Sequence, residues 1–253
     1  MPFCLPILTF HSLEDESSVI SFPPRVFQHG LRKLHESGYR TISLLNAVDC
    51  LRHGEPFPDR SFIITFDDGY QTVYDEAFSV LQRFDMSATV FLTVGEKRRA
   101  KISDRLPSLN GRPMLSWNEI QEMHRFGITF GAHTLTHPDL TRLSVDRIQL
   151  EIYESKRIIE DSLNTTVTSF AYPHGRYDHR IREIVQPYFT CAFSDKLGLV
   201  HAKSDLYVLE RVDAYYLRTK RLFDIMLTGW FPLYIRVRHI PRWIRRAIQH
   251  NLT

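Results

Sequence analysis

The sequence predicts an α/β fold with a mostly parallel sheet or barrel. Short apolar runs alternate with amphipathic stretches along most of the 253 residues, and polar residues stand directly after several of the apolar runs. In parallel α/β folds, strands and helices alternate in this way, and active residues lie at the carboxyl ends of the strands. Apolar residues at 43% and charged residues at 24% are typical of a folded globular chain.

The first half of the chain predicts three strands and two helices. They are strands at 7–10, 61–66 and 88–92, and helices at 25–37 and 74–84. The strands are short and rich in apolar residues, as buried parallel strands are. The second helix has Ala77, Phe78 and Leu81 on one face, which would pack on the sheet.

The second half continues the alternation. Its predicted elements are helices at 116–126, 144–163 and 179–185, and strands at 128–132, 169–171 and 190–193. Ser116 with Glu119 three residues later forms a capping box, which indicates where the first of these helices begins. Gly127 follows the helix and favours its termination there.

The cysteines and the apolar runs indicate the compartment. Cys4, Cys50 and Cys191 are widely spaced and form no Cys-x-x-Cys pair, so we expect small buried side chains in a reducing environment. The first residues lack the basic start and long apolar run of a signal peptide, and no run reaches the ~18 apolar residues of a membrane span. The sequence therefore predicts a cytoplasmic protein.

The end of the chain is strongly basic. Residues 217–253 hold eight Arg and Lys residues against Asp224 alone, a net charge of +7, so the rest of the chain carries −4. Arginines alternate there with aromatic and apolar residues: Trp230, Phe231, Tyr234, Ile235, Arg236, Arg238, Arg242, Trp243, Ile244, Arg245 and Arg246. This pattern suits the surface of an anionic membrane, and equally a C-terminal helix that packs on the barrel. Nucleic acid is not an expected partner, because the body is acidic and has no recognition motif.

Two groups of polar residues follow predicted strands. Asp67 and Asp68 come directly after residues 61–66, where a bound cation or a solvated Asp-Gly turn would relieve their repulsion. His133 and His137 follow residues 128–132, and a spacing of four places both rings on one side of a helical turn. One carboxylate and two imidazoles make a three-ligand site with open positions, as in catalytic metal centres, and leave the other aspartate free as a base.

These residues resemble a known family. Thr65-Phe66-Asp67-Asp68-Gly69, His133-Thr134-x-x-His137 and Phe170-Ala171-Tyr172-Pro173-His174-Gly175 are similar to the motifs of the polysaccharide deacetylases, the NodB-homology or carbohydrate esterase family 4 enzymes. The resemblance covers residues 1–215 and leaves 216–253 as a basic, aromatic helical tail. It implies a distorted (β/α) barrel with fewer than eight repeats.

The resemblance also implies a role for each motif residue. Asp68, His133 and His137 would bind one divalent metal, with Zn²⁺ as the first expectation and Co²⁺, Ni²⁺ or Fe²⁺ as ions that suit the same ligands. Asp67 would be the general base on a water that the metal activates. The backbone N–H of His174 would stabilise the oxyanion.

The sequence departs from many family members in two places. Ala171 stands where they have an arginine that orients the aspartate, and a late Leu-x-His motif is missing. The Phe-Ala-Tyr-Pro-x-Gly form resembles the poly-N-acetylglucosamine deacetylase branch, in which a histidine after an early aromatic residue is the general acid. His11 after Phe10 fits that description, although a strand-end cap is an alternative. Arg211 is a candidate to replace the missing arginine beside Asp67.

We therefore expect a hydrolase that removes N-acetyl groups from N-acetylglucosamine-type units of a polysaccharide or its lipid-linked precursor. A deformylase or an amidase on a small substrate is the alternative enzyme. A non-catalytic carbohydrate-binding barrel is less expected, because Asp67, Asp68, His133 and His137 are all present. The chain contains no Gly-x-Ser-x-Gly, glycine-rich phosphate loop or His-Glu-x-x-His, which excludes the motifs of three other enzyme classes.

Overall fold

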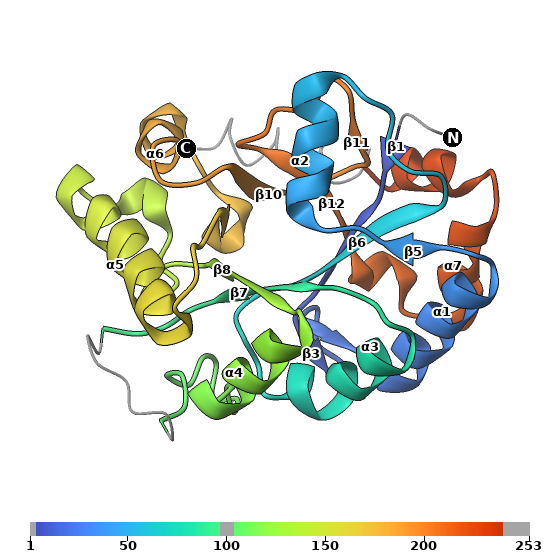
Figure 1. Cartoon of the computed structure of the whole chain (residues 1–253), viewed down its shortest axis with the longest axis horizontal. Helices are drawn as coiled ribbons and strands as arrows, with labels where there is room; N and C mark the ends of the chain where they lie inside the picture. The colour runs from blue at the N-terminus through green and yellow to red at the C-terminus, as the bar shows by residue number, and fades with distance from the viewer. Residues whose placement is uncertain (1–3, 97–103, 240–253) are drawn as a thin grey trace.

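Parallel strands close into a barrel at the centre of the molecule (Figure 1). The computed structural model describes residues 4–96 and 104–239. The barrel strands are β2 (Ile7–Phe10), β6 (Ser61–Phe66), β7 (Thr89–Leu92), β8 (Thr129–Ala132), β9 (Ser169–Ala171), β10 (Cys191–Leu197) and β12 (Leu209–Asp213). Each pairs in parallel with the next, and β12 returns to β2 to close the ring. The predicted distorted barrel with fewer than eight repeats is confirmed in these residues.

Helices surround the barrel, as Figure 1 shows. They are α1 (Pro24–Glu36), α2 (Leu44–His53), α3 (Ser79–Arg83), α4 (Trp117–Phe126), α5 (Val145–Leu163), α6 (His179–Val185) and α7 (Lys220–Asp224). Shorter strands are β1 (Cys4–Leu5), β3 (Ser12–Leu13), β4 (Ser21–Phe22), β5 (Arg40–Thr41) and β11 (Val200–His201). Of these, β5 adds to β6 outside the ring, whereas β1 pairs with β11 and β3 with β4.

The predicted helix boundaries rest on real caps. Ser116 accepts a hydrogen bond from the N–H of Glu119, and the Glu119 carboxylate accepts one from the N–H of Ser116. Ser144 likewise accepts from the N–H of Arg147 at the start of α5. Gly127 ends α4 with a φ of 106°, a left-handed conformation that glycine adopts without strain. Local hydrogen bonding therefore decides these boundaries.

Three predictions needed correction. The helix predicted at 74–84 begins as a π-helical segment, Val73–Phe78, before α3. Strand β10 runs to Leu197, four residues beyond the predicted end, because its outer half pairs with β12. Helix α2 and strand β12 were not predicted at all; β12 has the sequence Leu-Glu-Arg-Val-Asp, in which three of five residues are charged, so it contains no apolar run.

The described part of the C-terminal segment has one buried and one exposed side. Phe223, Met226, Phe231 and Ile235 are buried in the main hydrophobic core. Residues 231–239 are helical, and Trp230, Leu233 and Val237 are 70%, 50% and 55% exposed. Arg242, Trp243, Ile244, Arg245 and Arg246 lie outside the described residues, and the boundary between 215 and 216 stays a prediction. Among the described helices, none combines the length and apolar character needed to cross a bilayer.

Candidate active site

The acidic pair stands where β6 leaves the barrel. Asp67 still belongs to the sheet, because its N–H donates to the carbonyl of Phe10 on β2. Asp68 turns the chain with a φ of 74°, and Gly69 follows with a φ of 88°. A Cβ at Gly69 would lie 2.9 Å from Cδ2 of Leu92, so this tight exit from the strand requires glycine. Both carboxylates are buried at the carboxyl end of the barrel.

Asp68 meets both histidines of the second motif. Nε2 of His133 and Nε2 of His137 each lie 3.4 Å from Oδ1 of Asp68, and one ligand atom from each residue falls within 4.8 Å of the others. Oδ1 of Asp68 is buried and has no hydrogen-bond partner among the residues that the structure describes. A buried carboxylate oxygen without a donor is costly, and a divalent cation removes that cost. The donor set therefore fits a metal of the kind that imidazole and carboxylate bind.

The two histidines do not share a helical turn, as their spacing suggested. Residues 133–138 form a loop after β8, in which Thr134 and His137 have positive φ values of 70° and 57°. The hydroxyl of Thr134 accepts the N–H of His137 and helps to fold the loop back on itself. The rings still converge, because this loop brings their centroids within 4.8 Å. Four-residue spacing was a correct sign of proximity for the wrong reason.

The environment prepares these side chains as ligands. Nδ1 of His133 lies 2.7 Å from the carbonyl of Ala171 and donates to it, so Nε2 is the ring nitrogen that can bind a metal after losing its proton. Burial, reinforced by the charge of His133, lowers the pKa of His137 to about 3, so His137 is neutral at physiological pH. Burial would raise the pKa of Asp68, but contacts with His133 and the nearby histidine charges outweigh it and lower that pKa.

Arg211 contacts the other aspartate. Its Nη1 and Nη2 donate to Oδ1 and Oδ2 of Asp67 at 2.7 Å each, and its Nε donates to the carbonyl of Ser194 at 3.0 Å. Burial alone would raise the pKa of Asp67, but Arg211, followed by His133, outweighs burial and lowers it. Arg211 comes from β12 and is 144 residues from Asp67 in sequence. In the closed barrel only β2 lies between β12 and β6, so Arg211 can reach Asp67. The expected contact between Arg211 and Asp67 is present.

His11 and His174 complete the group. Nε2 of His11, which follows β2, lies 3.9 Å from Oδ2 of Asp67, and the His11 side chain is partly exposed. The His174 ring packs edge-on against His137, with centroids 4.5 Å apart. His174 has a φ of 56° in the turn Pro173–Gly175, which follows β9. All seven residues named from the sequence therefore lie at one end of the barrel.

One buried residue beside the site escaped the sequence reasoning. Glu151 on α5 is fully buried and accepts hydrogen bonds from the loop between the two histidines. Its signal was available, because it belongs to the face of α5 that carries Ile148, Ile152 and Ile159. A glutamate on the core face of a helix is rare unless it is paired. Its spacing alone did not indicate which backbone groups it would meet.

Comparisons with known proteins agree with this arrangement. The chain is 28% identical over 212 residues to Bacillus subtilis YxkH, which is named as a polysaccharide deacetylase, covering 83% of this chain and 71% of YxkH. It is 23% identical over 231 residues to the poly-β-1,6-N-acetyl-D-glucosamine N-deacetylase of Staphylococcus aureus, covering 87% and 76%. The Streptococcus pyogenes deacetylase PplD, solved with acetate, superposes with a TM-score of 0.74 at 25% identity, covering 84% of this chain and 93% of PplD.

A family model provides the assignment. The model described as polysaccharide deacetylase matches residues 54–188, more than half of the chain. The matched region contains Asp67, Asp68, His133, His137 and His174, whereas His11 and Arg211 lie outside it. With the barrel, the motif residues and the family match in agreement, this chain belongs to the polysaccharide deacetylase family of hydrolases.

Proposed function

We propose that this protein is a metal-dependent hydrolase that removes the N-acetyl group from N-acetylglucosamine-type units of a polysaccharide or its lipid-linked precursor. The observation that carries the metal dependence is Oδ1 of Asp68, buried 3.4 Å from Nε2 of both histidines and without a hydrogen-bond donor among the described residues. The substrate class is supported by the Staphylococcus aureus relative, which is named a poly-β-1,6-N-acetyl-D-glucosamine N-deacetylase.

Asp68, His133 and His137 would hold the metal, and Zn²⁺ is our first choice over Co²⁺, Ni²⁺ and Fe²⁺. When bound, a divalent ion at such a site lowers the pKa of a water molecule and polarises the amide carbonyl. Neutral His137 and ionised Asp68 suit this role without further change in protonation. His133 would bind through Nε2. Burial would lower the pKa of His133, but contacts with Asp68 and the charge of Asp67 outweigh burial and raise that pKa. His133 must therefore lose the Nε2 proton to bind, while Nδ1 keeps the proton that faces the Ala171 carbonyl.

Asp67 acts as the general base in this proposal. The charge of Arg211 keeps Asp67 ionised despite burial, so it can accept a proton from the attacking water. Oxygen then adds to the acetyl carbon, the carbon–nitrogen bond breaks, and acetate leaves. His11, 3.9 Å from Asp67, donates the proton that the departing amine requires. The backbone N–H of His174 stabilises the oxygen that gains negative charge.

Acetate release from N-acetylglucosamine oligomers tests this function. The protein is first treated with a chelator and then restored with Zn²⁺, with Asp67→Asn prepared in parallel. We expect no release after chelation, recovery with Zn²⁺, and none from the variant. Release that persists without metal would contradict the metal role. Metal binding without release from any oligomer would favour a deformylase or small-molecule amidase, and the absence of both would favour a non-catalytic barrel.

We further propose that the C-terminal helix rests on an anionic membrane surface, at the inner face of the membrane of a cytoplasmic enzyme. The helix spanning 231–239 buries Phe231 and Ile235, whereas Leu233 and Val237 on its other side, and Trp230 directly before it, are exposed. Arg236 and Arg238 beside this apolar side are exposed, and residues 217–253 carry a net charge of +7. Apolar rings next to arginines match the headgroup region of anionic lipid.

Sedimentation with lipid vesicles tests the membrane proposal. We expect the full chain to bind phosphatidylserine-containing vesicles and not pure phosphatidylcholine vesicles. Trp230→Ala combined with Leu233→Ala should weaken binding by about tenfold or more, because it removes most of the exposed apolar side. Leu45→Ala on α2, an equally exposed leucine elsewhere, is the matched control. Equal binding by the double variant, or a dimer that hides this side, would overturn the proposal.

A further inference from the structure

A buried glutamate holds the loop that carries both histidines. Oε2 of Glu151 accepts hydrogen bonds from the backbone N–H groups of Leu135 and Thr136 at 2.9 Å each, and Oε1 accepts one from the Thr136 hydroxyl at 2.7 Å. Both donor residues lie between His133 and His137. Glu151 itself contributes no atom to the ligand cluster. Its contacts therefore act on the loop and not on the reacting groups.

Burying the Glu151 carboxylate costs free energy, because the charge is removed from water. It is fully buried on the face of α5 that otherwise presents Ile148, Ile152 and Ile159 to the core. A buried charge is tolerated only when its hydrogen-bonding positions are filled, and an apolar residue of similar volume is often at least as stabilising. Stability of α5 alone would thus favour an apolar side chain. What the carboxylate adds, and an apolar side chain cannot, is acceptance of two backbone N–H groups.

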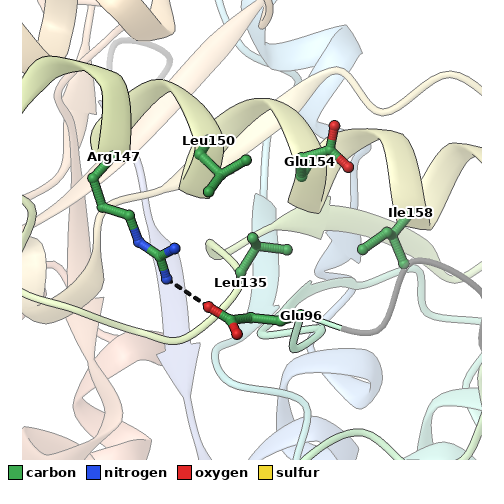
Figure 2. A pocket seen from close by; sticks show the side chains of 6 residues that line it. All are labelled: Glu96, Leu135, Arg147, Leu150, Glu154 and Ile158. Atoms are coloured by element: carbon green, nitrogen blue, oxygen red, sulfur yellow. Dashed lines mark hydrogen bonds and ion pairs between the residues drawn. The ribbon is translucent and has the colours of Figure 1, made fainter.

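Arg147 is the fourth hydrogen-bond donor to Glu151, and it also contacts Glu96 in the segment after β7. Its Nη2 donates to Oε1 of Glu151 at 2.8 Å and to Oε1 of Glu96 at 2.7 Å. Figure 2 shows Arg147 reaching from α5 to Glu96, with Leu135 beneath the helix. These three residues help to line a pocket of about 220 Å³. The N–H of Gly95, next to Glu96, donates to the carbonyl of Leu135 at 2.7 Å. The loop is therefore held from α5 and from the end of β7.

The loop needs such support because of its backbone. Thr134 and His137 adopt left-handed φ values of 70° and 57°, which are strained for residues that carry a side chain. A conformation of this kind persists only where surrounding contacts hold it. Without Glu151, two N–H groups between the histidines would lose their acceptor, and the loop would relax. Nε2 of His133 and of His137 would then no longer face Oδ1 of Asp68 together.

We propose that Glu151 is a positioning residue: it fixes the 133–137 loop so that both histidines are preorganised for one divalent metal. This inference rests on the proposed function for the identity of the ligand. It assigns to a residue of α5, remote from the reacting atoms, part of the metal affinity of the site. Outer partners that orient ligands in this way are worth about 10- to 100-fold in metal affinity.

Zn²⁺ affinity, measured by competition with a chromogenic chelator, is the first arm of the test. Glu151→Ala should weaken Zn²⁺ binding by about tenfold or more, because it removes all three hydrogen bonds that Glu151 accepts from the loop. Glu151→Gln should recover most of the affinity, since one amide oxygen can accept both backbone N–H groups as Oε2 does. Ile152→Ala is the matched control: it removes core packing from the same helix and leaves the hydrogen bonds of Glu151 to the loop in place. Its folded form should bind Zn²⁺ within about twofold of wild type.

Amide hydrogen exchange in the metal-free protein is the second arm. The N–H groups of Leu135 and Thr136 should exchange at least about tenfold faster in Glu151→Ala than in wild type or Ile152→Ala. Unchanged exchange and unchanged Zn²⁺ affinity in a folded Glu151→Ala protein would overturn the inference. If Glu151→Ala does not fold, Glu151→Gln and Thr136→Val, which removes one of the bonds, decide by the same two readouts. If wild type binds no Zn²⁺, the proposed function fails while exchange still decides whether Glu151 holds the loop.

Discussion

Two buried carboxylates, Asp67 and Glu151, are each paired with an arginine, but they accept different numbers of hydrogen bonds. Asp67 accepts two hydrogen bonds, both from Arg211, among the residues that the structure describes, and its Oδ2 also faces His11 at 3.9 Å. Glu151 accepts four, from Leu135, Thr136 twice and Arg147. A carboxylate has about four acceptor positions, so Glu151 is saturated and Asp67 is not. Glu151, with all its acceptor positions filled, is suited to holding the histidine loop in place. Asp67 keeps free acceptor positions and is suited to accepting a proton.

Their arginines also differ. Arg211 is as buried as Asp67 and lies about 6 Å from the ring centroids of Phe91 and Phe193. Arg147 is 37% exposed and is shared between Glu151 and Glu96. Among the described residues, Asp67 therefore receives its hydrogen bonds from Arg211 alone, whereas Glu151 has several donors. Substitutions at the two pairs should have very different consequences.

The largest expected effect is on activity at Asp67. Asp67→Asn cannot accept a proton, so deacetylation should slow by about 10²- to 10⁴-fold while one metal per chain is retained. Acetate release and metal content are the measurements. Glu210→Gln is the control, because Glu210 is also a buried carboxylate and adjoins Arg211 on β12 but bonds Lys196 and Ser204 outside the site. Activity close to wild type in Asp67→Asn would remove the distinction between the two acids.

Removal of the buried arginine should be next. Arg211→Ala leaves Asp67 as an uncompensated buried charge, which should lower the free energy of unfolding by about 3–5 kcal/mol and reduce activity as well. Urea denaturation measures the first effect. Arg211→Lys keeps a positive charge but loses the bidentate contact with Asp67, so its free energy of unfolding should lie between those of wild type and Arg211→Ala. A variant Arg211→Ala with unchanged stability and activity would show that Asp67 does not need this partner.

The corresponding change at the saturated acid should be small. Arg147→Ala leaves Glu151 with three of its four hydrogen bonds, and the lost ion pair is partly exposed. The free energy of unfolding should fall by only about 1 kcal/mol in the same urea experiment. A loss as large as that of Arg211→Ala would mean that the donors from the loop do not compensate the charge, and the comparison would break.

The smallest expected effect is on the stability contributed by Glu210, a third buried carboxylate, which accepts hydrogen bonds from Lys196 and Ser204. Burial would raise its pKa, but hydrogen bonds from Lys196 and Ser204 outweigh burial and lower it. Because the pKa of Glu210 is lower in the folded state, ionised Glu210 stabilises the protein at pH values above its ordinary pKa of 4.5. That contribution is lost as the pH falls through the lowered, folded-state pKa. Lys196 is half-exposed, so the effect should be about 1 kcal/mol or less. Glu210→Gln should be less stable than wild type at neutral pH, and this gap should close on acidification; a gap that widens would contradict the sign.

Much of the fold followed from local signals. Strands β2, β6 and β9 and helix α6 have the predicted bounds. The strands are short runs rich in apolar residues, and Asp178 caps the helix by accepting the N–H of Ile181. The caps at Ser116 and Ser144 likewise act within three or four residues. Strand β12 was missed because three of its five residues are charged, so it contains no apolar run. Its place beside β2 depends on closing the ring, which is a property of all the strands together.

The sequence by itself determined which side chains would gather at the barrel mouth. Asp67 and Asp68, His133 and His137, and His174 each follow a strand, and the carboxyl ends of parallel strands meet at one end of a barrel. Only the tertiary structure decided how they are held: Arg211 arrives from β12 after ring closure, and Glu151 reaches the histidine loop from a helix. The physical reason is that a strand end follows from periodicity along the chain, whereas the partner of a buried charge depends on which distant segments pack against it.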